Sequence, residues 1–332
     1  MAGDFGTRFM PEMTACRYRD GHWGEVEFLP SDKLVLSPGA HVLHYASTCF
    51  EGLKAFRHDD GRVALFRIDA NVARFAQSSE LLYLPPIDQA TVTDMITSVV
   101  ARFRDEVPAP PASMYIRPTH IGTEASIGKA ADPSSESLLY VLLSPVGDYF
   151  AGGEANLRVL LAEHGGRAPS DHGLVKGGGN YASALKHIMR AREAVNAQQV
   201  LFCPDGDVQE TGAANFLLID GDTIITKALD ESFLHGVTRA SILQIARDRG
   251  YTVEERELSV SELLERAVHG DAEAGLSGTA AVLASVGTLI HEGREYTVGA
   301  GQPGPRIREL RETLNAIQWG RAEDPYGWVS FV

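Results

Sequence analysis

The most regular apolar pattern of the chain lies between residues 88 and 107, in DQATVTDMITSVVARFRDEV. Positions 92, 95, 96, 99 and 100 are apolar, and this spacing places them along one side of a helix. The preceding segment GRVALFRI (61–68) is mostly apolar and favours a strand, and Asp69 follows it at a position typical of a helix N-cap. We therefore expect a strand, a helix through 70–82 capped by Asp69, and a second helix over 88–107.

Two further apolar segments predict strands farther along the first half, SMYIRPTHIG (113–122) and ESLLYVLLSPVG (136–147). A loop marked by glycine and proline joins them. The stretch GDYFAGGEA (147–155) is typical of an interdomain linker.

The second half repeats this mixture of strands and helices. Strands are expected at 156–163, 199–204, 208–220 and 223–229, and the tight turn DGD (220–222) predicts that the last two form a hairpin. Helices are expected at 180–198, at 236–250 where Gly250 ends the helix, from the capping-box pair Ser259 and Glu262, and at 306–319 before an irregular tail.

Because strands and helices mix in both halves, the sequence predicts a mixed α/β (α+β) protein with two domains. We expect an N-terminal α/β domain at 1–146, a linker at 147–153 and a C-terminal α/β domain at 154–332.

Composition narrows the class of protein. Hydrophobic residues make up 44% and charged residues 22% of the 332 residues, which is typical of a soluble globular protein. No apolar run approaches the roughly 20 residues that a membrane span needs. The start, MAGDFGTRFM, lacks the basic-then-apolar layout of a secretory signal, so we expect the cytoplasm.

Charge and cysteine content argue against two classes of site. Lys and Arg number 30 against 44 Asp and Glu, and the net charge of −14 disfavours nucleic-acid binding. Cys16, Cys49 and Cys203 are widely spaced without a CxxC pair, which argues against a disulfide framework and a zinc site. His41 and His44 lack further ligands nearby, so we interpret them as structural and expect no metal.

One lysine, Lys176, stands directly before three glycines in LVKGGGNYA (174–182). A GxxxxGK nucleotide loop has its lysine after the glycines, so the order here excludes it. GTEASIGKA (122–130) has the wrong glycine spacing and Ala130 where a hydroxyl is needed, and a GxGxxG fingerprint after a strand is missing. A lysine beside glycine-lined backbone also suits a Schiff base to a flat cofactor, although on these residues alone a solvated lysine before a helix is the simpler interpretation.

A family resemblance favours the Schiff-base interpretation of Lys176 over the solvated lysine. KGGGNYASAL resembles the KxGGNY signature of branched-chain aminotransferases, the pyridoxal-phosphate enzymes of fold type IV. Other segments resemble that family's blocks in the family's order and span nearly the whole chain. They are HYASTCFEGLKAFR (44–57), MYIRPTHIGTEASIG (114–128), LLSPVGDYFAGG (142–153), HGVTRASIL (235–243), SGTAAV (277–282) and IQWGR (317–321).

The resemblance implies a two-domain fold of the D-amino acid aminotransferase-like kind with pyridoxal 5'-phosphate as cofactor. It implies a homodimer, with active sites near the subunit interface, that moves an amino group between a branched-chain or related L-amino acid and 2-oxoglutarate. Two alternatives remain: C–C lyase chemistry on the same scaffold, as in aminodeoxychorismate lyase, and a catalytically idle scaffold that binds a partner. The presence of Lys176, Arg67, Glu210 and Thr279 together argues against the idle scaffold.

The resemblance also assigns the cofactor residues. Lys176 is expected to be the catalytic lysine, which links covalently to the cofactor and moves the proton. Glu210 would keep the pyridine nitrogen protonated, and Tyr181 would hydrogen-bond the ring oxygen. The phosphate would be bound by Arg67, the hydroxyl of Thr279 and the amides of Val237 and Thr238, which open a helix.

For the substrate, the resemblance implies a carboxylate site and an apolar wall. The carboxylate would be bound by Tyr115, Arg117 and the amides of Ala280 and Ala281, because a planar guanidinium suits bidentate binding. The wall residues would be Phe5, Tyr45, Phe50 and Tyr149.

The chain also departs from the family pattern. SDHGLVK precedes the catalytic position in place of a glycine-rich segment, and His235 and Ser285 stand where proline is common. Lys129 occupies a place where relatives typically have a small apolar residue that reaches the neighbouring subunit's substrate pocket. Either Lys129, together with His172, tunes the enzyme toward a donor with a polar or anionic side chain, or Lys129 extends into solvent at the dimer edge.

Overall fold

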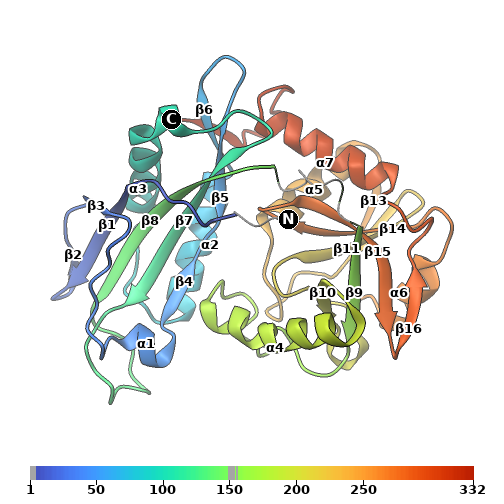
Figure 1. Cartoon of the computed structure of the whole chain (residues 1–332), viewed down its shortest axis with the longest axis horizontal. Helices are drawn as coiled ribbons and strands as arrows, with labels where there is room; N and C mark the ends of the chain where they lie inside the picture. The colour runs from blue at the N-terminus through green and yellow to red at the C-terminus, as the bar shows by residue number, and fades with distance from the viewer. Residues whose placement is uncertain (1–4, 149–153, 155) are drawn as a thin grey trace. The chain divides into compact units, whose positions relative to one another are not determined.

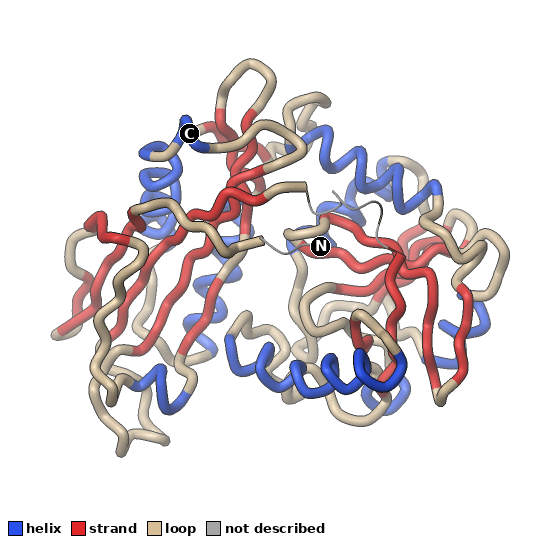
Figure 2. The backbone as a smooth tube through the Cα atoms, in the orientation of Figure 1, coloured by secondary structure: helices blue, strands red, loops and turns tan. Residues whose placement is uncertain are grey.

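The chain forms two compact units, each built around its own β-sheet (Figures 1 and 2). The computed structural model describes residues 5–148, 154 and 156–332. The first unit comprises the described part of Met1–Tyr149 with Val175–Gly178 and Ile317–Val332, and the second comprises the described part of Phe150–Leu174 with Gly179–Ala316.

The mixed α/β class expected from the sequence is confirmed, because both units combine helices with strands. Most of the expected linker, residues 149–153, lies outside the described residues. The expected domain boundaries therefore stay a prediction.

The sheet of the first unit is antiparallel throughout its described strands. Its order is β17-β6-β5-β7-β8-β1-β2, with β3 paired to β1 and β4 paired to β7. The strands are β1 (Glu12–Arg19), β2 (His22–Trp23), β3 (Glu27–Pro30), β4 (Thr48–Phe50), β5 (Leu53–Arg57), β6 (Val63–Phe66), β7 (Ser113–Gly122), β8 (Ser137–Val146) and β17 (Val329–Phe331). The helical elements are α1 (His41–Tyr45), α2 (Ile68–Leu81), α3 (Gln89–Arg102) and the short 3-10 turn η1 (Arg104–Glu106).

The helical stripe over 88–107 is confirmed in α3. All five of its apolar residues are fully buried in the core between the sheet and the helices α2 and α3. Asp88 caps the helix, since its carboxylate accepts the Thr91 N–H over 3.0 Å.

The expected cap of the preceding helix was wrong. Arg67, in a left-handed conformation with φ 52°, is the N-cap of α2, and Asp69 lies within the first turn. The Arg67 carbonyl accepts the Asn71 N–H over 3.1 Å, so the helical hydrogen bonds begin before Asp69. The tail was also expected to be irregular, but β17 pairs antiparallel with β6 there.

The sheet of the second unit mixes parallel and antiparallel pairs in the order β10-β9-β15-β14-β11-β12-β13, with β16 paired to β15. The strands are β9 (Asn156–Ala162), β10 (Gln199–Phe202), β11 (Asn215–Asp220), β12 (Thr223–Thr226), β13 (Thr252–Glu255), β14 (Glu273–Gly278), β15 (Val282–His291) and β16 (Arg294–Thr297). The helices are α4 (Gly178–Val195), η2 (Pro204–Gly206), α5 (Val237–Asp248), α6 (Val260–Ala267) and α7 (Pro305–Gln318).

Several local predictions for this half are confirmed. The DGD turn joins β11 and β12 as a hairpin, Gly250 follows α5 with φ 89°, and Ser259 caps α6 by accepting the Glu262 N–H over 3.1 Å. The expected strand 208–220 is shorter, because a turn over 211–214 interrupts it and Glu210 forms only an isolated bridge with Asn215. Among the described residues, no helix is both long and apolar enough to cross a membrane.

Candidate active site

In the first unit, the backbone around Lys176 is fixed on both sides. The Lys176 N–H donates to Ser78 Oγ over 3.1 Å, and the Lys176 carbonyl accepts the Phe50 N–H over 2.9 Å. The next residue, Gly177, forms a β-bridge with Cys49, and a Cβ there would come within 3.1 Å of a facing backbone oxygen. A side chain at position 177 would therefore make a tight contact with the facing strand, and glycine avoids it.

The ring of Phe50, at the end of β4, contacts two cationic groups of the same unit. The Lys176 amine lies 5.3 Å from the ring centroid, and the Arg117 guanidinium carbon lies 4.6 Å from it. Both distances are in the range of a cation–π contact. One aromatic side chain therefore connects the expected catalytic amine with the expected carboxylate-binding residue.

Arg117 and Tyr115, both on β7, line a cavity of about 420 Å³ in the first unit. Arg117 Nη2 donates to the Tyr115 hydroxyl over 3.0 Å, and the Phe5 ring packs edge-on against Tyr115 at 4.9 Å. The lining residues are Phe5, Gly6, Phe9, Phe50, Tyr115, Arg117, Thr119, Tyr140, Leu142 and Ser144. Arg117 Nε is buried and has no hydrogen-bond partner among the described residues. The cavity thus combines aromatic walls with a guanidinium that has a donor to offer an anion.

A buried ion pair holds the backbone next to Phe50, one of the residues that line this cavity. Arg74 on α2 makes two hydrogen bonds of 2.6 and 2.8 Å to Glu51, which also accepts the Gly52 N–H over 3.0 Å. A Cβ at Gly52 would come within 2.0 Å of the Tyr115 hydroxyl oxygen. The pair therefore holds the backbone after Phe50 where only glycine leaves room for Tyr115.

Arg67, also in the first unit, joins β6 to α2. Burial lowers the pKa of its guanidinium from the usual range, and the nearby Asp69 acts in the opposite direction. Its backbone N–H donates to the Trp328 carbonyl over 2.8 Å. A partly desolvated guanidinium is a good binding group for a doubly charged phosphate.

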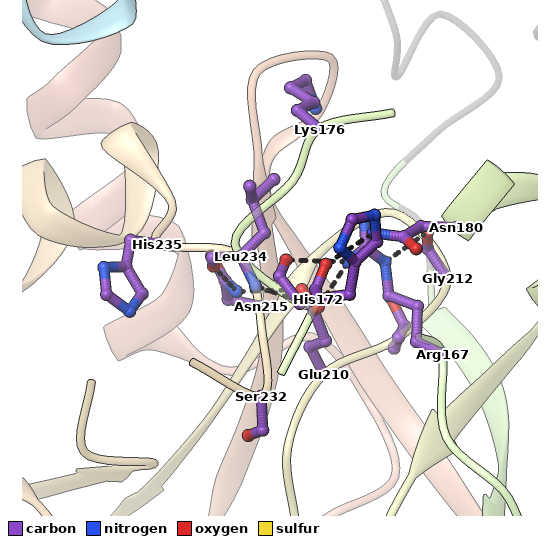
Figure 3. A network of polar contacts seen from close by, with 12 residues as sticks. Arg167, His172, Lys176, Asn180, Glu210, Gly212, Asn215, Ser232, Leu234 and His235 are labelled. Atoms are coloured by element: carbon purple, nitrogen blue, oxygen red, sulfur yellow. Dashed lines mark hydrogen bonds and ion pairs between the residues drawn. The ribbon is translucent and has the colours of Figure 1, made fainter. Parts of the chain in front are cut away.

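In the second unit, Glu210 is held by a network of charge-assisted hydrogen bonds (Figure 3). Arg167 Nη1 donates to Glu210 Oε1 over 2.8 Å, the Leu234 N–H donates to the same oxygen over 3.0 Å, and Asn215 Nδ2 lies 3.3 Å from Oε2. The Glu210 and Arg167 side chains are only 3% and 2% exposed. The carboxylate is therefore fixed in position rather than free to rotate.

Arg167 and Asn215 connect Glu210 to the other expected cofactor residues. The Arg167 guanidinium carbon lies 5.2 Å from the Tyr181 ring centroid. Asn215 Nδ2 also donates to the Leu234 carbonyl over 2.8 Å, two residues before Gly236, the N-cap of α5. The start of α5 is thereby tied to the same network as Glu210.

The remaining expected groups of the second unit lie at chain turns. Val237 and Thr238 open α5, whose first amide groups have no partner within the helix, and no side chain caps it. Thr279, Ala280 and Ala281 form the turn between β14 and β15. Val282, just after them, has φ 61°, a conformation that costs a β-branched residue energy and is concentrated at functional sites.

Comparison with known proteins identifies the family. The family model of the class IV amino-transferases matches residues 48–286. A probable branched-chain-amino-acid aminotransferase of Streptomyces coelicolor is 38% identical over 98% of this chain and 91% of its own, and branched-chain-amino-acid transaminase 1 of Bacillus subtilis is 36% identical over 98% and 93%. The chain belongs to the branched-chain amino acid aminotransferase family.

Solved structures agree with this assignment. A T.th. branched-chain amino acid aminotransferase with pyridoxamine 5'-phosphate has a TM-score of 0.77 and 27% identity, covering 96% of this chain and 98% of that one. The same enzyme complexed with N-(5'-phosphopyridoxyl)-L-glutamate has a TM-score of 0.74 and 26% identity with the same coverage. This branched-chain aminotransferase family member is a pyridoxal-phosphate-dependent transaminase of fold type IV, and the expected cofactor is confirmed.

The donor groups of this aminotransferase fit that cofactor. The fixed carboxylate matches the pyridine nitrogen, and the amine matches the aldehyde. The phosphate is matched by the desolvated guanidinium, the hydroxyl and the helix N-terminal amides. Arg167 Nη2 is buried without a hydrogen-bond partner among the described residues, which leaves one more donor beside Glu210. Arg67 and Lys176 belong to the first unit, and Tyr181, Glu210, Val237, Thr238 and Thr279 to the second.

Two expected substrate residues of the first unit, Tyr45 and Lys129, are not among the residues that line the cavity with Arg117. Tyr45 lines a second cavity of about 400 Å³ and donates to the Ile127 carbonyl over 2.5 Å. Lys129 Nζ lies 2.5 Å from Glu124 Oε1, and this contact, followed by the Ser135 N–H, lowers the pKa of Glu124 to about 2. Tyr149 lies outside the described residues. The substrate roles of these three residues stay predictions, as do the roles of the other expected site residues.

Four residues around this site were missed at the sequence level: Arg167, Asn215, and the pair Glu51 and Arg74. Arg167 stands in the loop segment GGRAPS, and no periodicity or motif distinguishes it from a surface arginine. The role of such a polar side chain becomes recognisable only when the fold brings its partner residue next to it. For Asn215, its position five residues after Glu210 was the only available signal.

Proposed function

We propose that this protein moves an amino group between a branched-chain or closely related L-amino acid and 2-oxoglutarate. The observation that carries the proposal is the Phe50 ring, which contacts both the Lys176 amine and the Arg117 guanidinium. An amino acid whose carboxylate binds Arg117 would lie against the same Phe50 ring as the Lys176 amine, the group that the reaction needs near the substrate's amino group. The T.th. relative binds a phosphopyridoxyl-glutamate compound, which supports glutamate and 2-oxoglutarate as the second pair.

Each of the expected cofactor-binding residues has a role in this reaction. Pyridoxal phosphate, when bound, withdraws electrons from the substrate carbon that loses its proton. Lys176 would anchor the cofactor covalently, and its amine would then move that proton from the substrate carbon to the cofactor. Glu210, held by Arg167, keeps a proton on the pyridine nitrogen, and Tyr181 orients the ring through its hydroxyl. Arg67, Thr279 and the amides of Val237 and Thr238 bind the phosphate.

The substrate side uses the cavity of the first unit. Arg117 and Tyr115 bind the carboxylate, while Phe5 and Phe50 exclude water from the aliphatic side chain. The amides of Ala280 and Ala281 are the further donors that the family resemblance implies. The same guanidinium suits the second carboxylate of glutamate in the other half of the reaction. One site can therefore serve both amino acids in turn.

We also propose a homodimer in the cytoplasm, with active sites near the subunit interface. Leu43 on α1 and Ile127 in the loop after β7 are 60% and 70% exposed, and the Tyr45 hydroxyl binds that loop. Large exposed apolar side chains are typical of an interaction surface. The cytoplasmic location is supported by three buried cysteines that form no disulfide. Ile127→Asp should shift the dimer toward monomer in light-scattering measurements.

The function is tested by separating the two half-reactions. Leucine, isoleucine or valine alone should convert the cofactor absorbance of the purified holoenzyme in one turnover, and 2-oxoglutarate should restore it with release of glutamate. Failure of all three amino acids to change the spectrum would contradict the donor class. A normal first half without recovery by 2-oxoglutarate would contradict only the acceptor.

A further inference from the structure

The backbone of Arg67 is held in an unfavourable conformation by the end of the chain. Arg67 has φ 52°, a left-handed conformation that side chains other than glycine rarely adopt. Its N–H donates to the Trp328 carbonyl over 2.8 Å, and its own carbonyl accepts Asn71 Nδ2 over 2.7 Å. Such a conformation persists where surrounding contacts determine it, and here one of those contacts comes from a residue 261 positions later.

The side chain of Trp328 lies against the same arginine. The Arg67 guanidinium carbon is 5.1 Å from the Trp328 ring centroid, within the range of a cation–π contact. The N–H donors of a guanidinium lie in its own plane and point outward from its edges, where they can bind an anion. The indole therefore restrains Arg67 without using the groups that a phosphate needs.

The position of Trp328 is in turn determined by the tail itself. Its ring stacks on Tyr326 at 4.0 Å, and the Asp324 carboxylate accepts the N–H groups of Tyr326 and Val329. Val329 then pairs with Phe66, which places Trp328 beside the residue that follows Phe66 in the chain. These contacts within segment 324–329 therefore hold Trp328 in place beside Arg67.

We propose that Trp328 is a positioning residue for the cofactor phosphate and that segment 324–329 is part of the phosphate site. The proposal rests on the proposed role of Arg67 as a phosphate ligand. Trp328 itself touches Arg67 and acts only through it. Loss of the indole removes this contact while Arg67 keeps its charge, so the guanidinium is less well positioned and the phosphate contributes less to cofactor affinity.

The test compares dissociation constants of pyridoxal 5'-phosphate and of pyridoxal, which lacks the phosphate, on the apoenzyme. Trp328→Ala should lower the affinity advantage of the phosphorylated form by about tenfold, the upper part of the range for a cation–π contact. Trp328→Phe, which keeps an aromatic face, should retain most of that advantage. Phe331→Ala is the matched control, since Phe331 is an aromatic residue three positions after Trp328, on β17, and its ring contacts Arg62 and not Arg67.

The outcomes separate this inference from the role of Arg67. If Arg67→Ala leaves the advantage unchanged, the phosphate assignment of Arg67 fails. Suppose that Arg67→Ala reduces the advantage but Trp328→Ala lowers the affinity for both ligands by the same factor. Trp328 then has only a structural role, and the inference is overturned. Where thermal melting shows that Trp328→Ala does not fold, Trp328→Leu fills the volume without an aromatic face and decides the question in its place.

Discussion

The guanidinium of Arg167 lies 2.8 Å from the carboxylate of Glu210, although 43 residues separate them in the chain. Both side chains are almost completely buried, and the Arg167 guanidinium also stacks on Tyr181. Loss of either partner leaves a charge in the interior without its counter-charge. Arg167 therefore helps to fix the position of the carboxylate that we propose for the pyridine nitrogen.

This pair is tested with a double-mutant cycle. Arg167→Met should destabilise the fold by about 3–5 kcal/mol, because the buried Glu210 carboxylate loses its counter-charge. Glu210→Gln should leave the cofactor bound but slow the proton-transfer half-reaction by about 3–4 kcal/mol in barrier, the scale of one preorganised catalytic donor. The double variant should be more stable than Arg167→Met alone. Denaturant unfolding and single-turnover rates measure both effects, and additive destabilisation would show that the two side chains do not interact.

Lys176 should be the one lysine that binds the cofactor covalently. Borohydride reduction of the holoenzyme followed by peptide mapping should place the adduct on Lys176, and Lys176→Ala should abolish it. Lys186, exposed on α4, provides the matched control, and Lys186→Ala should leave both the adduct and the yellow colour intact. An adduct on any other lysine would overturn the assignment of Lys176.

Lys129 should influence the choice of amino donor through the partner subunit. An ammonium near an aliphatic side chain needs a polar partner, so Lys129→Val should favour leucine, isoleucine and valine over a polar or anionic donor by about 1–3 kcal/mol. Ratios of kcat/KM for the two classes of donor measure this change. Glu124→Gln removes the ion pair but keeps the lysine, and serves as the control. If both variants leave the ratios unchanged, Lys129 is only a solvated edge residue.

Stability should fall in mild acid because of His120. The imidazole is fully buried between the hydroxyls of Ser79 and Ser137, and burial lowers its pKa from 6.5 to about 3. Between these values the unfolded chain binds a proton that the folded chain does not, so the free energy of unfolding decreases as the pH falls from about 6.5 toward 3, by up to roughly 1.4 kcal/mol per unit.

The measurement is a series of denaturant unfolding curves between pH 4.5 and 7. His120→Gln should flatten the dependence on pH, whereas substitution of the exposed His22 by glutamine should leave it as in the wild type. An equal slope in the wild type and in His120→Gln would mean that another group causes the loss of stability.

Local patterns determined much of this structure without any knowledge of the fold. The five apolar residues of α3 were predicted from the period of a helix, which a sequence displays directly. The DGD hairpin and the Ser259 cap follow from contacts between residues a few positions apart. The family blocks, which span nearly the whole chain, determined the fold type and the cofactor for a different reason, because several motifs in one order are specific to a known scaffold.

Only the tertiary structure decided which polar side chains meet. Three contacts join residues that are distant in the chain. Arg167 and Glu210 are 43 positions apart, Arg74 and Glu51 are 23 positions apart, and Trp328 and Arg67 are 261 positions apart. A lone arginine in a loop has the same sequence signature whether it is solvated or buried. Its partner depends on strand register and helix packing, as when β17 pairs with β6 and brings Trp328 to Arg67. Hydrophobic periodicity determines which face of an element is buried, but the register of distant segments determines which charges are buried together.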